Sequence, residues 1–467
     1  MMVRPNRDII VLMLGTHVSK ALYIVEEEIR EITMEGSNDY LIPSYVSFVR
    51  DDTRVGIKPW SMQYPDQTVR YAVRLLNCLG NRLEVEEERR FSSVPIEDDV
   101  DGKPVYRIAN NTQEYWKPCE IVYIIAKYLV DLCRKRNEIP ITRCALVIPD
   151  DYTDINKDVL TRIIEKTGVE VVCQMTESES VSYFLQEDCI REEERFSWES
   201  RPILLYNMGA CGFTASVVRL SDEPRVVATT TTHTIGGRKM LEIIIKQMVE
   251  DVDRQYGVSL FNGTGESKYC KKEYLKLLAE IEDCLSLFSY DSEIEIALPA
   301  RCRTMILRRR RKQREERQRG DRVGMGMIQH QHRHQYQDGN GNGNGNGNGN
   351  GNGNGNGNGN GNGNGNGFKK EEEEEEEDPS YKLSEFKLQS IMAPLIETSL
   401  NMCELTLAKA GLCFEDVFRV VPLGASCSNK LIENALIRKF TNGRIVKSGN
   451  RWMAGVLGLG YYARDSL

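Results

Sequence analysis

The chain has 467 residues, with 61 Lys and Arg against 69 Asp and Glu, so its formal charge at pH 7 is −8. This acidic balance argues against a protein that coats nucleic acid through phosphate contacts, and we expect no specific nucleic-acid partner. No run of about eighteen apolar residues is present, so we expect no membrane span. The thirteen cysteines contain no CxxC pair, which favours reduced thiols in a cytoplasmic protein and no structural metal site.

The first predicted element is a β-hairpin. The segment DIIVLMLGTHVSKALYIVE, which begins at Asp8, consists of an apolar run, a turn of glycine and small residues, and a second apolar run. The segment RPILLYNMGACGFTASVVRL, which begins at Arg201, repeats this pattern with Gly209 at the place of Gly15. The repeat predicts two similar lobes, each of which opens with a hairpin.

An alternation of helices and strands lies between the two hairpins. Pro118 begins a predicted helix whose apolar residues recur at helical spacing. A strand is predicted from Cys144 to Ile148, a helix from Asp154 to Lys166 and a further strand from Val169 to Val172. This succession is typical of a mixed sheet that is covered by helices.

The second hairpin is followed by a similar succession. The predicted elements are a helix from Gly237 to Arg254, a helix through Leu275 and Leu285, a strand from Glu293 to Leu298, a helix from Glu385 to Lys409, a strand from Phe418 to Leu423, a turn from Gly424 to Ser426 and a helix that begins near Asn429.

The composition changes between residues 301 and 378. An Arg-rich block is followed by alternating Gly and Asn from Gly339 to Gly367, and then by an acidic run. Such a segment buries too little apolar surface to offset the entropy lost on ordering, so we predict a disordered, low-complexity insert. Because the flanking blocks are both periodic, we expect the insert to protrude from one folded unit.

Several glycine-containing turns have the composition of phosphate-binding loops. Glycine lets backbone N–H groups approach a phosphate, because no Cβ atom stands in the way. These turns, together with LIPSYVSFV from Leu41, TTHTIGGRKM from Thr231 and RVVPLGASCSNKLIENAL from Arg419, resemble the nucleotide-binding domain of the heat-shock 70 (Hsp70) chaperone family. The resemblance implies an α/β, two-lobed actin-like ATPase fold with duplicated ribonuclease-H-like subdomains.

The resemblance also implies a domain organisation. Residues 1–198 would form lobe I, and residues 199–300 and 379–467 would form lobe II, with the C-terminal segment returning to lobe I. Residues 301–378 would be the disordered insert. No segment resembles the peptide-binding half of the family, so we expect no peptide-binding domain.

The resemblance implies an ATP or ADP site at the turns. Its candidate binding residues are Gly15, Thr16, His17, Glu177, Gly209, Gly212, Gly236, Gly237, Glu280, Gly424 and Ser426.

Three family positions carry residues that cannot perform the family's chemistry. Met13 stands where the family has the Asp that orders the magnesium shell, Val73 where it has the Lys that positions the attacking water, and Asn207 where it has the Asp of the second hairpin. A thioether cannot organise hydrated Mg²⁺, and an amide cannot serve as a base. We therefore assign no catalytic residue and no metal ligand, while Arg74 or His17 could partly replace a missing cation.

We predict a pseudo-ATPase of the chaperone system, with weak ATP binding or none, that acts as an interaction or regulatory module. One alternative is an active, ATP-hydrolysing molecular chaperone. Another is a sugar-kinase-like enzyme, for which the sequence offers no catalytic carboxylate in a supporting context. The resemblance implies J-domain proteins, nucleotide-exchange factors or ribosome-associated chaperones as partners. The absence of a long apolar run leads us to expect no membrane partner.

Overall fold

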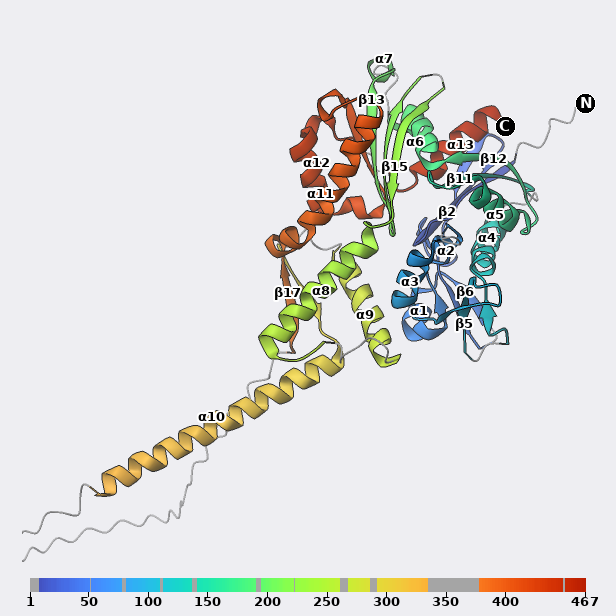
Figure 1. Cartoon of the computed structure of the whole chain (residues 1–467). Coiled ribbons are helices and arrows are strands. Elements are labelled where there is room, and N and C mark those ends of the chain that lie inside the picture. The colour runs from blue at the N-terminus through green and yellow to red at the C-terminus, as the bar shows by residue number, and fades with distance from the viewer. Residues whose placement is uncertain are drawn as a thin grey trace, which may run out of the picture. The chain divides into compact units, whose positions relative to one another are not determined.

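The structure, a computed structural model, describes residues 8–50, 52–77, 81–109, 112–136, 141–189, 195–221, 223–260, 268–285, 292–334, 378–447 and 450–467 (Figure 1). The chain divides into two compact units, one formed by Met1–Ala297 with Tyr381–Leu467 and the other by Leu298–Ser380. We use the names lobe I and lobe II for the parts of the first unit that are built on the first and the second hairpin. None of the described helices is long and apolar enough to cross a membrane.

The main sheet of lobe I is built around the predicted first hairpin. Its central strand is parallel to one neighbour and antiparallel to the other, and a short strand, β4 (Ile42–Pro43), pairs with β2 beside the main path. The strand order is β12 (Glu170–Thr176), β11 (Arg143–Ile148), β1 (Ile9–Met13), β2 (Val18–Val25) and β3 (Glu28–Glu31).

Helices cover both faces of this sheet, which explains why its inner strands are apolar throughout. Ile10 and Leu12 of β1 face a core cluster that includes residues of α4 (Pro118–Lys135). The alternate residues, Ile9 and Val11, face a second cluster with α6 (Glu177–Phe184) and α13 (Ala454–Ser466). The C-terminal helix α13 therefore packs on lobe I, against α6, β1, β2 and β11 (Figure 1).

Smaller elements complete lobe I. They are a sheet of β6 (Asp52–Val55), β5 (Val46–Val49) and β7 (Thr68–Val69), a sheet of β10 (Tyr115–Trp116), β9 (Pro104–Arg107) and β8 (Ile96–Asp98), and the helices α1 (Lys58–Gln63), α2 (Ala72–Asn77), α3 (Arg82–Phe91) and α5 (Asp154–Glu165). The short helix α7 (Arg195–Trp198) lies beside the lobe II strand β13 (Pro202–Met208), and its Trp198 packs against Phe418 (Figure 1).

Lobe II repeats the central pattern of lobe I. Its hairpin strand β13 pairs antiparallel with β14 and parallel with β18, as β1 does with β2 and β11. The strand order is β15 (Arg225–Thr232), β14 (Phe213–Arg219), β13 (Pro202–Met208) and β18 (Arg419–Leu423). The other elements are β16 (Glu293–Ala297) paired with β17 (Ser380–Ser384), and the helices α8 (Gly237–Tyr256), α9 (Lys268–Leu285), α11 (Glu385–Lys409) and α12 (Lys430–Phe440).

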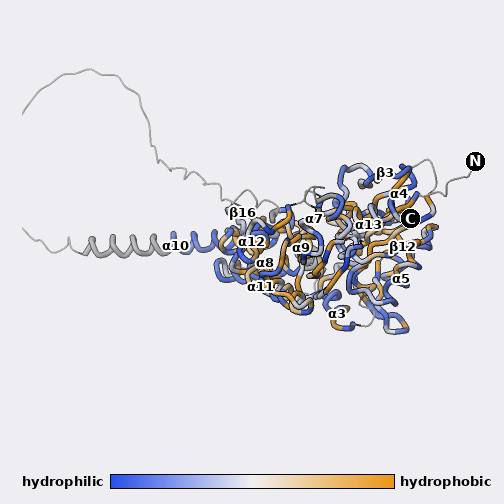
Figure 2. The backbone as a smooth tube through the Cα atoms, turned by 90° about the horizontal axis from the view of Figure 1, so that it is seen from above, coloured by the Kyte–Doolittle hydropathy of each residue, from blue (hydrophilic) through white to orange (hydrophobic). Residues whose placement is uncertain are grey.

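The second unit contains the helix α10 (Ala300–His334), so the prediction of disorder from residue 301 is wrong for residues 301–334. Its sequence is rich in Arg, Gln, Glu and Met, which all favour helix, and Glu315 and Glu316 stand at helical spacing from arginines on both sides. Figure 2 shows the start of α10 as strongly hydrophilic, which is the property that predicted disorder. The remainder of the predicted insert, residues 335–377, lies outside the described residues.

Candidate functional site

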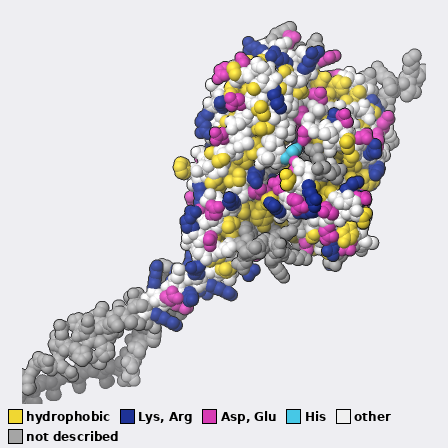
Figure 3. Space-filling view, viewed as in Figure 1, with side chains coloured by type: hydrophobic (Ala, Val, Ile, Leu, Met, Phe, Trp, Pro, Cys, Tyr) yellow, Lys and Arg dark blue, Asp and Glu magenta, His cyan; other side chains and the backbone are white. Residues whose placement is uncertain are grey.

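A cavity of about 560 Å³ lies between the two lobes of the first unit. The turns of both hairpins contribute to its wall, together with the start of α8, the turn after β18 and residues of α2 and α9. Figure 3 shows a histidine and charged side chains of both signs near the middle of the face on which the lobes meet. The hairpin turns that were predicted to surround a ligand therefore do line one cavity.

Two glycines in this wall are required by close backbone approach. A Cβ atom on Gly15 would lie 2.2 Å from the carbonyl oxygen of Val18. Gly424 has φ +80°, and a Cβ atom there would lie 2.3 Å from the carbonyl oxygen of Met208. Only glycine fits either position without a backbone shift.

The predicted site residues Gly15, Thr16, His17, Glu177, Gly209, Gly212, Gly237, Gly424 and Ser426 line the cavity, and Gly236 lines a smaller one beside it. Glu280 does not line the cavity, whereas Glu282, which is also on α9, does. Residues two positions apart on a helix point in directions that differ by about 200°, so Glu280 and Glu282 lie on different faces of α9.

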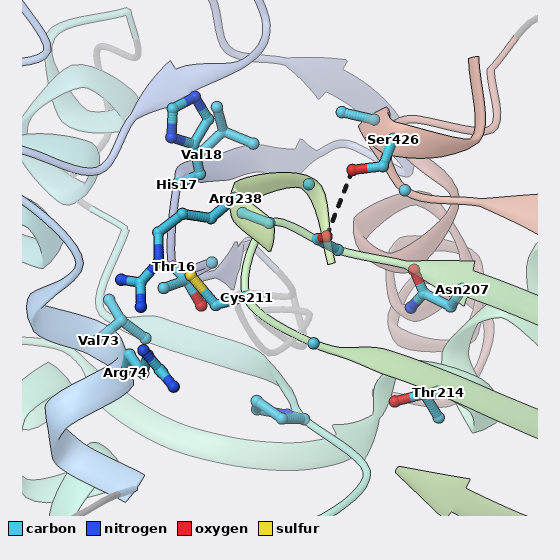
Figure 4. A pocket seen from close by; sticks show the side chains of 18 of the residues that line it. Thr16, His17, Val18, Val73, Arg74, Asn207, Cys211, Thr214, Arg238 and Ser426 are labelled. Atoms are coloured by element: carbon cyan, nitrogen blue, oxygen red, sulfur yellow. Dashed lines mark hydrogen bonds between the residues drawn. The ribbon is translucent and has the colours of Figure 1, made fainter. Parts of the chain in front are cut away.

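The Gly-Gly start of α8 is not a free phosphate cradle. The N–H of Gly237 donates to the carbonyl of Gly209 at 2.9 Å, and the N–H of Arg238 donates to the carbonyl of Ala210 at 2.8 Å. The hydroxyl of Ser426 lies 3.4 Å from the Gly209 carbonyl, which Figure 4 marks as a dashed line. These hydrogen bonds hold α8 and the turn after β18 against the second hairpin, so the N–H groups of Gly237 and Arg238 are already used within the protein.

The three replaced family positions, Met13, Val73 and Asn207, all line the cavity. Figure 4 shows Val73 beside Arg74 on one side of it and Asn207 on the opposite side. Val73 is buried, with 4% of its surface exposed. An apolar side chain there can neither position water nor carry charge.

A lysine that the sequence analysis missed stands beside Met13. The antiparallel register of β1 and β2 pairs Met13 with Lys20, and the Lys20 Nζ lies 4.0 Å from the Met13 Sδ. Lys20 faces Glu177, whose carboxylate accepts a hydrogen bond from Asn207. Burial raises the pKa of Glu177 and lowers the pKa of Lys20, and the attraction between the two groups opposes both shifts.

These residues do not fit a hydrated magnesium ion. Mg²⁺ requires oxygen ligands, whereas Met13 offers a thioether and Glu177 already faces an ammonium group. Over the described ranges, no group of three or more His, Cys, Asp and Glu side chains is placed to hold a metal. Because the ammonium group of Lys20 lies among these side chains, the site favours an anion over a metal ion.

A buried ion cluster joins the lobes at the side of the cavity. Glu88 of α3, which is 1% exposed, accepts hydrogen bonds from Arg74 at 3.1 Å and from Arg238 of α8 at 2.7 Å. Arg74 also binds Glu87 at 2.7 Å, and Arg238 binds Glu242 at 3.2 Å. Figure 4 shows the guanidinium groups of Arg74 and Arg238 close together. Arg74, which the sequence analysis considered as a replacement for a missing cation, is therefore paired with the carboxylates of Glu87 and Glu88.

Two histidine–carboxylate pairs also cross between the lobes. His17 of the first hairpin turn lies 3.1 Å from Glu282 of α9, and His233, which follows β15, lies 2.8 Å from Asp151 of lobe I. The hydrogen bond to Asp151 raises the pKa of His233, and burial opposes this shift. The pKa of Glu282 is lowered, because the hydrogen bond and charge of His17 outweigh the effect of burial.

Arg238, His233, Asp151 and Lys20 are cavity residues that sequence reasoning missed. His233 and Arg238 lie in or next to the HTIGG segment, so they could have been predicted as cavity residues from that motif. Lys20 could have been found from the hairpin register, because it pairs with the position already singled out at Met13.

The duplicated sheets, the two facing hairpins and the cavity between them define a protein of the two-lobed actin-like ATPase class. Residues 9–311 match the family model described as "Hsp70 protein". This match covers more than half of the chain, and the protein belongs to the Hsp70 family.

The curated relatives are distant. The chain is 22% identical over 264 residues to "Heat shock 70-related protein 5" of Dictyostelium discoideum, which covers 55% of this chain and 51% of the relative. It is 21% identical over 270 residues to "Mitochondrial-type heat shock protein 70" of Encephalitozoon cuniculi, which covers 55% of this chain and 42% of the relative. The chain therefore spans about half the length, or less, of these two relatives.

Proposed function

We propose that this protein is an Hsp70-family domain that has lost ATP hydrolysis and acts as an interaction or regulatory module in protein folding. The observation that carries the proposal is that Met13, Val73 and Asn207 line the cavity at the positions that the family resemblance assigns to charged groups. Phosphoryl transfer depends on positioning and on charge stabilisation, and the loss of one such group costs about 10²- to 10³-fold in rate. Three losses together would leave no measurable turnover.

The contacts between the lobes support the same proposal. The ion cluster around Glu88 and the two histidine–carboxylate pairs hold the cavity walls together through side chains of the protein itself. A domain that closes in this way needs no bound Mg-ATP to present a closed surface to a partner. The Hsp70 assignment also disfavours the sugar-kinase alternative.

Phosphate release from Mg-ATP tests the loss of hydrolysis. We expect purified protein to release no phosphate above the enzyme-free blank, while an Hsp70 nucleotide-binding domain with all three charged residues does so in the same assay. The triple variant Met13→Asp, Val73→Lys and Asn207→Asp restores the three charged residues. Phosphate release by this variant would show that the rest of the site can still support hydrolysis. Steady release that scales with the concentration of the parent protein would favour the active chaperone instead.

The partners that we propose are a J-domain protein, a nucleotide-exchange factor or a ribosome-associated chaperone, encountered in the cytoplasm. The proposal is supported by membership of the family, since co-factor partners are a general property of Hsp70 chaperones. Surface plasmon resonance with the immobilised full chain and purified co-factors of each class would test it. Absence of binding to all three classes would contradict it.

A further inference from the structure

Lys20 occupies an unusual place in the cavity. It lies on β2 directly opposite Met13, and side chains of such a cross-strand pair emerge on the same face of a sheet with Cβ atoms about 5 Å apart. Lys20 therefore lines the same wall as Met13, at the place where the resemblance expects a carboxylate that orders magnesium. The pairing brings an ammonium group next to the residue that stands in place of the family's magnesium-ordering carboxylate.

The Lys20 ammonium is poorly satisfied by its protein neighbours. In the part of the chain that the structure describes, its hydrogen-bond acceptor is the Met13 thioether at 4.0 Å, and a thioether is a weak acceptor. The side chain is half-buried, and its charge partner is the carboxylate of Glu177. An ammonium group has three donors, so this arrangement leaves capacity for an anionic ligand in the cavity.

The other carboxylates in the wall do not compensate for the missing magnesium ligand. Asp151 is bound to His233, and Glu282 is bound to His17. Glu84 accepts a hydrogen bond from Asn81 at 3.0 Å. A ligand that arrived with a divalent cation would place that cation beside Lys20, whereas a ligand that arrived as a free anion would be attracted to it.

We propose that the cavity binds a nucleoside polyphosphate as the metal-free anion, with the Lys20 ammonium in the charge-neutralising place of the divalent cation. The inference rests on the proposed function, because it concerns the same cavity and a ligand that is held without hydrolysis. The volume of about 560 Å³ lies within the range of cavities that hold a ligand of this size. The turns at Gly15 and Gly424 shape the cavity walls around that ligand.

Isothermal titration of the full chain with ATP tests this inference, once in EDTA and once with magnesium in excess over ATP. We expect the dissociation constant to be lower in EDTA by about tenfold or more, a difference that the method resolves easily. Equal or tighter binding in magnesium would overturn the inference, and so would the absence of binding in EDTA.

Two variants assign the effect to the lysine. Lys20→Met keeps the length of the side chain and removes its charge, and we expect it to weaken binding of ATP in EDTA by about tenfold. Lys127→Met is the matched control, because Lys127 lies on the exposed surface of α4 and pairs with Asp131. An unchanged affinity in Lys20→Met, with the control also unchanged, would overturn the role of Lys20.

The double variant Met13→Asp with Lys20→Met exchanges the cation for a carboxylate. We expect it to bind ATP more tightly with magnesium than without, which reverses the preference of the parent. Circular dichroism of each variant verifies that it is folded, and the titrations of the parent stand independently of the variants. Phosphate release by the parent would contradict the proposed function alone, whereas tight magnesium-dependent binding without release would contradict this inference alone.

Discussion

His233 provides a proton-dependent contact between the lobes. Its ring is hydrogen-bonded to Asp151 at 2.8 Å, and Glu84 and Arg74 act on it with opposite signs. The net effect raises the pKa of His233 above the ordinary value of about 6.5. A histidine whose pKa is raised by folding stabilises the folded state below its unfolded pKa, and this contribution is lost as the pH rises through the folded pKa.

The variant His233→Gln tests this linkage. We expect its deficit in free energy of unfolding, relative to the parent, to be greatest near pH 6 and to shrink by pH 8.5, because the parent loses the charged pair over that interval. Urea denaturation at a series of pH values measures the deficit. Val227→Thr, an exposed change on the neighbouring strand β15, serves as the control and should show no such trend. A deficit that grows with pH would contradict the linkage.

At the scale of single elements, the packing of α13 on α6 depends on a helical glycine. A Cβ atom on Gly458 would lie 1.7 Å from the carbonyl oxygen of Ser180, so the two helices are in backbone contact there. The hydroxyl of Ser180 also donates to the carbonyl of Gly455. Any side chain at Gly458 must push α13 away from lobe I.

We expect Gly458→Ala to destabilise the protein by about 3 kcal/mol, at the upper end of what overpacking a buried site costs. Gly443→Ala is the matched control, because a Cβ atom on Gly443 meets no atom within 4 Å. Thermal and urea unfolding of both variants measure the difference. A loss of less than about 0.5 kcal/mol in Gly458→Ala, which is typical of surface changes, would show that the helices separate easily.

The elements differ in how well the sequence predicted them. Helix α11 was predicted with its observed bounds, and in the structure Ser384 caps its first turn by accepting a hydrogen bond from the N–H of Lys387. Helix α10 was missed because charge density was weighed above helix propensity. The glycine turns of the site were predicted from their composition, since close backbone approach leaves a local signal in the sequence.

The remaining part of the site left no local signal. Arg238 and Glu88 are 150 positions apart, and α3, which carries Glu88, was not among the predicted elements. An ion pair of this kind depends on how the lobes face each other, and neither residue alone distinguishes a buried contact from an exposed one. Tertiary pairings of this type could therefore not be predicted from one sequence.

At the scale of the whole molecule, the cluster around Glu88 joins the two lobes through buried charges. Arg74, Glu88 and Arg238 are 5%, 1% and 7% exposed, so their charges depend on one another for compensation. Removal of one member of a buried ion pair costs about 3 kcal/mol or more, because the partners stay buried without compensation.

Glu88→Gln is therefore expected to lower the free energy of unfolding by about 3 kcal/mol and to loosen the two lobes. Asp283→Asn removes the carboxylate from the exposed Lys58–Asp283 pair, which also joins the lobes, and is expected to cost less than about 1 kcal/mol. Urea unfolding gives both values, and small-angle scattering reports the separation of the lobes. Equal costs for the two variants would mean that the buried cluster is not the main tie.

The return of α13 to the first lobe has a consequence for biosynthesis. A ribosome makes β1, β2 and β11 early, whereas the apolar residues of α13 that cover them, among them Val456 and Leu459, emerge after every other described element. Until α13 has been made, the nascent N-terminal half exposes an apolar face of its sheet, and such intermediates are prone to aggregate. We therefore expect the newly made chain to aggregate most readily before α13 has been synthesised.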